Sequence, residues 1–173
     1  MISLRFLVTT LIIIINFILQ TTIFSYIEFW GVRPNASIIL IVSFAIFRYD
    51  GEGAIIGFFT GLLQDIIFGS VIGVHAFLGM TIGYFCGKPF KDFYAENYLL
   101  PLFLVFVSTL FYEFAYYIIT FFFRGKLDMF FYLKRIILPS IIYTALLSIP
   151  AYRFFYAINK KIEKFEKPKR KLF

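Results

Sequence analysis

The stretch GEGAIIGFFTGLLQDIIFGSVIGVHAFLGMTIGYFCG, residues 51–87, holds nine of the chain's eleven glycines, together with Asp65 and the only histidine, His75. Glycines at this density in a chain rich in Phe and Ile have two uses. They let helices pack closely in a lipid environment, or they shape a loop that holds a ligand. The rest of the sequence decides between these uses.

The composition identifies the solvent of this protein. Of its 173 residues, 61% are hydrophobic and 23% are aromatic, and the mean hydropathy is +0.85. A water-soluble domain of this size could not bury so much apolar surface, because a small core leaves many residues on the outside. Several apolar runs approach the roughly 20 residues that a membrane-spanning helix needs. The sequence therefore predicts an all-α integral membrane protein.

Cysteine, histidine and charge exclude several classes of site. One cysteine, Cys86, and one histidine exclude a disulfide framework and leave too few ligands for a metal cluster, so we predict neither metal nor cofactor. Eight of the seventeen Lys and Arg residues follow Tyr152. A basic tail that leaves a membrane helix is typical of a cytoplasmic anchor facing anionic lipid. Nucleic acid is not an expected partner, since no aromatic and basic module accompanies the tail.

The apolar runs predict about six transmembrane helices in a membrane domain of residues 1–158, followed by a basic tail, 159–173. The expected spans are 6–27, 36–48, 54–68, 74–86, 99–123 and 136–157. The first run exceeds the apolar core of a signal peptide and is expected to be retained. The second helix is short for a full span, so it is either tilted within a cluster of helices or surrounded by a thinned membrane. The third and fourth are also short, and we expect them to be largely buried among other helices. The third and fourth could also form a re-entrant pair.

The distribution of basic residues predicts the orientation. With the N-terminus inside, twelve Lys and Arg residues lie on inner segments and five on outer loops, as the positive-inside bias requires. Both termini are therefore expected in the cytoplasm. The segment RGKLDMFFYLKR, residues 124–135, is expected to be an outer connector, although its four basic residues weaken the bias.

The glycines follow a helical spacing. Many lie four residues apart, which gives each of two helices a smooth face. No Lys and Ser or Thr pair follows them as in a phosphate-binding loop. We therefore predict a helix-packing face or a partner interface formed by Gly53, Gly57, Gly61, Asp65, Gly69, Gly73, Gly79 and Gly83.

Asp65 and His75 lie on this face or beside it. Asp65 is either a coupling or ligand group, or a cap that fixes the turn between the third and fourth helices, and we favour the cap. His75 begins the fourth helix, where its ring could meet the Asp65 carboxylate as an ion pair or serve as an ordinary hydrogen-bonding residue.

Other polar residues also lie within or beside the apolar runs. Gln20 shares a helix face with Asn16, Pro34 disfavours a helical Arg33, and Asn35 is a candidate cap. Glu113 is expected to point inward, either for transport or as a buried hydrogen-bonding group. No catalytic motif is present, so we do not expect an enzyme.

The order of these features resembles the MreD family of rod-shape-determining proteins. The resemblance rests on Gln20, on Pro34 and Asn35, and above all on the stretch GFFTGLLQDIIFGSVIGVHAF, residues 57–77. In that stretch the matching residues are Gly57, Phe58, Gly61, Leu62, Asp65, Gly69, Gly73, His75 and Ala76. After about Pro89 the likeness is one of hydropathy alone.

The resemblance implies a six-helix fold similar to the substrate-binding subunits of energy-coupling-factor transporters. It also implies a non-enzymatic role in the bacterial cytoplasmic membrane. The implied partners are the bitopic protein MreC, the cytoskeletal protein MreB and the peptidoglycan synthases of cell elongation.

Two functions of different class follow. The favoured one is a scaffold whose glycine faces receive a partner's transmembrane helix. The alternative is a substrate-binding subunit of a small-molecule transporter, with Asp65, His75 and Glu113 lining a pocket. We favour the scaffold because the polar groups within the apolar runs look few and scattered.

Overall fold

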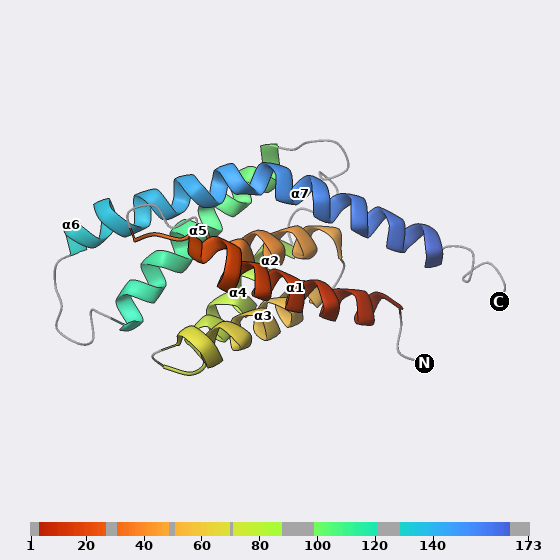
Figure 1. The fold of residues 1–173 in the computed structure, drawn as a ribbon, viewed down its shortest axis with the longest axis horizontal. Helices are drawn as coiled ribbons and strands as arrows, with labels where there is room; N and C mark the ends of the chain where they lie inside the picture. The colour runs from red at the N-terminus through yellow and green to blue at the C-terminus, as the bar shows by residue number, and fades with distance from the viewer. Residues whose placement is uncertain are drawn as a thin grey trace.

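The computed structural model describes residues 4–26, 31–48, 51–69, 71–87, 99–120 and 129–166, and all regular elements within these ranges are helices (Figure 1). In chain order they are α1 (Leu4–Tyr26), α2 (Ala36–Phe47), α3 (Glu52–Phe68), α4 (Val74–Gly87), α5 (Leu99–Thr120), α6 (Met129–Tyr132), the π-helical turn η2 (Leu133–Ile137) and α7 (Leu138–Glu166). The first five predicted helices are confirmed to within a few residues at the described ends. The predicted end of the fifth, residues 121–123, lies outside the described residues, as does the tail beyond residue 166.

Helix α2 forms the centre of the molecule. It packs against α1, α3, α4, α5 and α7, and its residues from Ala36 to Ile46 are all buried. Asn35 caps it, because the side-chain oxygen accepts a hydrogen bond from the backbone N–H of Ile38 at 3.3 Å, as predicted. A helix of 12 residues rises only about 18 Å and cannot cross a bilayer core of roughly 30 Å. Its enclosure by protein explains how so short an apolar helix is accommodated.

Helices α3 and α4 form a closely packed antiparallel pair. A Cβ atom on Gly57 would overlap the carbonyl oxygen of Gly79, and one on Gly83 would overlap that of Gly53. A Cβ atom on Gly61 would lie 2.6 Å from the Cα atom of Ala76. The two backbones can approach this closely only because glycine has no side chain. The close packing predicted from the glycine spacing is therefore found within the chain, at Gly53, Gly57, Gly61, Gly79 and Gly83.

The opposite faces of this pair are open, so the expectation that α3 and α4 are largely buried is wrong. Phe59 and Ile66 of α3 and Phe77 and Phe85 of α4 are exposed. The glycine spacing buries one face of each helix and leaves large apolar side chains on the other, which is the pattern of a helix pair that meets lipid on its outer side.

Residues 129–166 form one continuous helical segment, in which α6, η2 and α7 follow without a break. The prediction that residues 129–135 belong to a connector is therefore wrong, and the predicted last span, 136–157, lies within this longer helical segment. The π-helical turn has a local cause. Pro139 has no N–H to donate, and the backbone N–H of Leu138 bonds to the carbonyl of Leu133, one residue farther back than in an α-helix.

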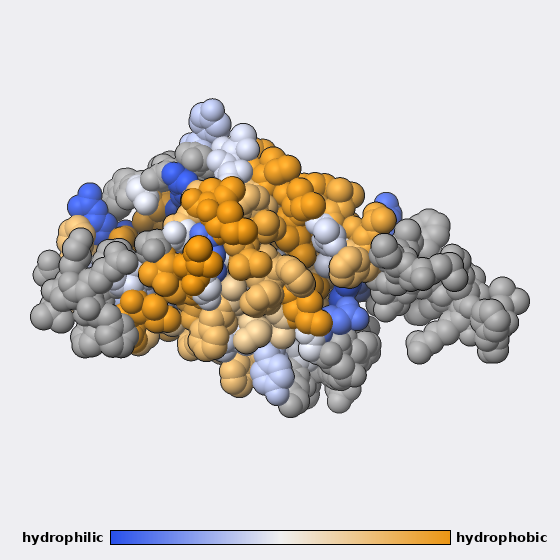
Figure 2. Space-filling view, turned by 90° about the horizontal axis from the view of Figure 1, so that it is seen from below, coloured by the Kyte–Doolittle hydropathy of each residue, from blue (hydrophilic) through white to orange (hydrophobic). Residues whose placement is uncertain are grey.

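The surface fits a lipid environment. Three helical segments are long and apolar enough to cross a membrane, namely 6–23, 99–120 and 129–162, and α2, α3 and α4 are shorter. Hydrophobic residues cover most of the middle of the face shown in Figure 2. Helix α1 begins and α7 ends at the same end of the molecule (Figure 1). Together these features describe an integral membrane protein with three long and three shorter apolar helices.

Candidate functional site

A polar pocket of about 450 Å³ lies where the C-terminal parts of α1, α3 and α5 meet the start of α4 and the α6–η2–α7 segment. We call it the polar pocket. It is lined by Gln20, Gly31, Val32, Arg33, Asn35, Gln64, Phe68, His75, Tyr112, Glu113, Tyr116, Tyr132, Ile136 and Ser140. Four of the predicted polar residues, Gln20, Asn35, His75 and Glu113, therefore meet in one place. The expectation that the polar groups are scattered is wrong, because the fold gathers them.

A chain of hydrogen bonds links five helices along the pocket wall. The Ser37 hydroxyl donates to Oε1 of Gln20 at 2.6 Å, and Nε2 of Gln64 donates to the Ser37 oxygen at 3.1 Å. The Tyr112 hydroxyl donates to Oε1 of Gln64 at 3.2 Å and is also hydrogen-bonded to Nδ1 of His75. Each buried side chain in the chain thus has a partner, which fixes its rotamer and makes the wall rigid.

His75 ends this chain of hydrogen bonds. Its Nδ1 atom shares a hydrogen bond with the Tyr112 hydroxyl, and the tautomer of the imidazole decides which of the two atoms donates. The imidazole ring lies nearly parallel to the ring of Tyr116, with the centroids 4.8 Å apart, and to that of Tyr112 at 5.7 Å. Of the two alternatives for His75, the structure supports the hydrogen-bonding residue, because its ring contacts these tyrosines while the Asp65 carboxylate accepts from backbone N–H groups.

Asp65 is a cap, as favoured from the sequence. Its two carboxylate oxygens accept hydrogen bonds from the backbone N–H groups of His75 at 3.0 Å and Ala76 at 2.9 Å. These groups lie in the first turn of α4, whose N–H groups have no helical acceptor. The buried carboxylate therefore joins the end of α3 to the start of α4 and is not part of the lining of the polar pocket.

Glu113 is in a different position. It lines the pocket, and its Oε1 atom accepts a hydrogen bond from the Ser140 hydroxyl at 2.8 Å. Among the residues that the structure describes, no lysine or arginine pairs with it. The same part of the chain contains no group of three or more His, Cys, Asp or Glu residues that could hold a metal ion.

A family model described as rod shape-determining protein MreD matches residues 1–162. The chain belongs to the MreD family. It is accordingly a rod-shape-determining protein of the bacterial inner membrane, in agreement with its apolar helices. No match to the chain was found among curated proteins or among solved structures.

The glycine faces of this MreD-family chain are not open to a partner along the middle of the α3–α4 pair. Gly53, Gly57 and Gly61 of α3 face Gly83, Gly79 and His75 of α4. The hypothesis that these faces receive a partner's helix is therefore wrong for these positions, because the chain's own helices fill them. The other two glycines of the predicted set shape the turn: Gly69 ends α3, and Gly73 has a φ of +102°, a conformation that glycine adopts without strain.

A second concave surface lies between α1 and α7, with α2 as its floor. We call this apolar groove of about 370 Å³ the α1–α7 groove. It is lined by Ile12, Ile15, Asn16, Leu19, Ala36, Ile39, Leu147, Pro150, Ala151, Phe154, Phe155 and Ile158. Asn16 is the only polar side chain in this lining, and its amide nitrogen has no hydrogen-bond acceptor among the described residues.

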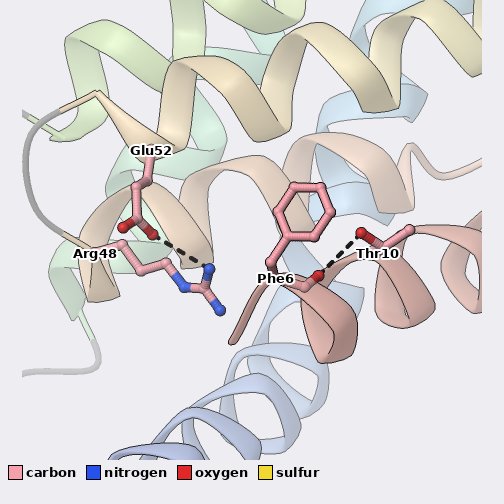
Figure 3. Close-up of polar contacts among 4 residues, drawn as sticks. All are labelled: Phe6, Thr10, Arg48 and Glu52. Atoms are coloured by element: carbon pink, nitrogen blue, oxygen red, sulfur yellow. Dashed lines mark hydrogen bonds and ion pairs between the residues drawn. The ribbon is translucent and has the colours of Figure 1, made fainter. Parts of the chain in front are cut away.

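The end of the molecule opposite the polar pocket carries a charged pair between the end of α2 and the start of α3. Arg48 contacts Glu52 at 3.2 Å, and its guanidinium lies over the ring of Phe44 at 5.1 Å from the centroid. Figure 3 shows this pair near the start of α1, where the Thr10 hydroxyl donates to the Phe6 carbonyl at 2.9 Å. These contacts fix the ends of helices, and we assign them no ligand.

Several residues of the polar pocket were not predicted from the sequence, among them Gln64, Tyr112, Tyr132 and Ser140, and neither was Ser37, which is hydrogen-bonded to Gln20 and Gln64. A polar residue inside an apolar run is a signal that was available for Ser37 and Gln64. The tyrosines gave no such signal, because the chain has 12 of them spread along its length.

Proposed function

We propose that this MreD-family chain is a non-enzymatic scaffold of the bacterial cell-elongation machinery. It supports rod shape and lateral peptidoglycan synthesis by binding an MreC-like bitopic protein. An MreB-like cytoskeleton and peptidoglycan synthases act in the same complex. The family assignment supports this role.

The orientation is part of this proposal. The membrane domain of residues 1–158 places both termini in the cytoplasm, and the basic tail, 159–173, meets anionic lipid there. The polar pocket then lies toward the outer side of the membrane, since it is at the end of the molecule where α1 ends and α4 begins.

The α1–α7 groove is the observation that carries the partner-binding part of the proposal. Helix α1 packs on α2 and α3, and α7 packs on α2 and α5, so the groove between α1 and α7 stays open along α2. An apolar groove of this kind suits a single apolar transmembrane helix, which packs by close contact and by interhelical hydrogen bonds.

One polar side chain of the groove lining lacks a hydrogen-bond partner. The amide nitrogen of Asn16 has no acceptor among the described residues. In lipid, a Ser, Thr or Asn side chain on a partner helix could accept its hydrogen bond.

Filling the groove tests the proposal. Ala151→Leu adds bulk to the groove lining and is expected to reduce co-purification of a co-expressed MreC-like protein at least about tenfold, which corresponds to roughly 1.4 kcal/mol. Ala157→Leu is the matched control, since Ala157 is exposed on the same helix and does not line the groove. Equal recovery of the partner with both variants would remove the groove from the interface.

The transporter hypothesis remains as a second candidate because of the polar pocket. Convergent polar groups with tyrosines beside them are what a substrate-binding subunit needs, and the fold implied by the resemblance is that of energy-coupling-factor subunits. Purification from native membranes in mild detergent separates the two functions. The scaffold predicts a single-span protein and wall synthases in the eluate, whereas the transporter predicts an ATPase pair and a coupling subunit.

A further inference from the structure

We propose that the polar pocket binds a small molecule carrying a cationic nitrogen, as an ammonium or guanidinium group, with Glu113 as its counter-charge. This inference goes beyond the scaffold function and does not depend on it, because the pocket and the α1–α7 groove share no lining residue.

The size and lining of the pocket indicate a small polar ligand. Its volume of about 450 Å³ falls within the range of roughly 300–1,000 Å³ typical of small-molecule sites. Its polar side chains come from α1, α3, α4, α5, α6 and α7 and from the loop before α2. An acyl chain offers these polar side chains no hydrogen bonds, whereas a ligand with donors and acceptors can add to the hydrogen bonds that they make with one another.

Glu113 determines the charge of the ligand. A carboxylate inside an apolar helix is stable when it is paired, neutral or in contact with water. The other buried carboxylate, Asp65, has two backbone donors. Glu113 has a single donor, Ser140, and no cationic partner among the described residues. A ligand cation in the pocket would supply the missing charge and donors.

Aromatic rings in the same lining fit this assignment. Phe68, Tyr112, Tyr116 and Tyr132 all line the pocket beside Glu113. The faces of such rings attract cations, and sites for organic ammonium ions use several aromatic rings in this way.

The test is thermal unfolding of the purified full chain in detergent with simple probes. Methylammonium and methylguanidinium chloride supply the cation, and acetamide and sodium chloride are the neutral and ionic controls. We expect each organic cation to raise the Tm of the wild type by at least about 2 °C, and Glu113→Gln to abolish this shift. Glu52→Gln, an exposed acid at the far end of the molecule, is expected to keep it.

Four outcomes would overturn the proposal. They are no cation-specific shift in the wild type, an equal shift with acetamide, an unchanged shift in Glu113→Gln, and loss of the shift in Glu52→Gln. If Glu113→Gln does not yield folded protein, Tyr116→Leu takes its place. That variant removes one ring from the wall and is expected to reduce the shift by at least half, and an undiminished shift would again overturn the proposal.

The ammonium group has two possible sources, a free amine or the headgroup of a lipid. Phosphatidylethanolamine added to the detergent supplies the second, and phosphatidylglycerol is its control without an amine. A Glu113-dependent shift with phosphatidylethanolamine that exceeds the shift with methylammonium assigns the site to lipid. A Glu113-dependent shift with the free cations alone assigns it to a soluble ligand.

Discussion

Asp65 shows at the residue scale how a carboxylate is held inside an apolar helix pair. It accepts hydrogen bonds from two backbone N–H groups of α4 that have no other acceptor. We expect Asp65→Ala to lower the free energy of unfolding by about 2–4 kcal/mol, because it removes the cap and leaves two buried donors unpaired. Asp65→Asn keeps one acceptor and should cost about half as much. Thermal unfolding of the detergent-purified variants measures both, and equal stability of wild type and Asp65→Ala would contradict the capping role.

Single residues were predictable from the sequence where their role is local. The cap at Asn35 follows from its residue type and its position directly before a helix, and the cap at Asp65 follows from a carboxylate in the last turn of a helix before a short turn; both are confirmed. The partner of His75 was not predictable. Tyr112 lies 37 residues farther along the chain, and nothing in the local pattern distinguishes it from the other tyrosines.

The α3–α4 pair belongs to the scale of elements, and its glycines allow a matched comparison. Gly57→Ala places a methyl group against the Gly79 backbone, whereas Gly87→Ala meets Ala45 at an easier distance of 3.3 Å. We expect Gly57→Ala to destabilise the protein by about 3 kcal/mol, since neither backbone can move far, and Gly87→Ala to cost less than about 1 kcal/mol. Unfolding in detergent measures the difference. Similar Tm values for the two variants would contradict the close approach of the helices.

Elements were predictable as helices, but some of their limits were not. Apolar runs marked five helices correctly, because length and hydropathy alone determine them in lipid. The basic pair Lys134 and Arg135 suggested a connector, yet these residues continue the helix. The π-helical turn that accommodates Pro139 depends on the backbone, and the sequence pattern does not reveal it.

The polar pocket exists only at the scale of the whole molecule. Gln20 and Ser140 are 120 positions apart in the sequence, and both line it. The spacing of residues shows which side chains share a face of one helix. It does not show which helices pack together, so the sequence did not predict that these side chains meet. The same limit applies to the glycines. Their spacing predicted a close contact between helices, but it did not show that both helices, α3 and α4, belong to this chain.

The central claim is that a partner's transmembrane helix occupies the α1–α7 groove. Photo-crosslinking in cells that express the MreC-like protein tests this claim most directly. A photoreactive amino acid is placed at Leu147, which lines the groove, or at Phe111 as the control. Phe111 is exposed on α5 and does not line the groove. The account predicts a crosslink to the single-span partner from position 147 and none from position 111. A crosslink from position 111 alone, or none from either position while the partner still co-purifies, would place the interface elsewhere and contradict the claim.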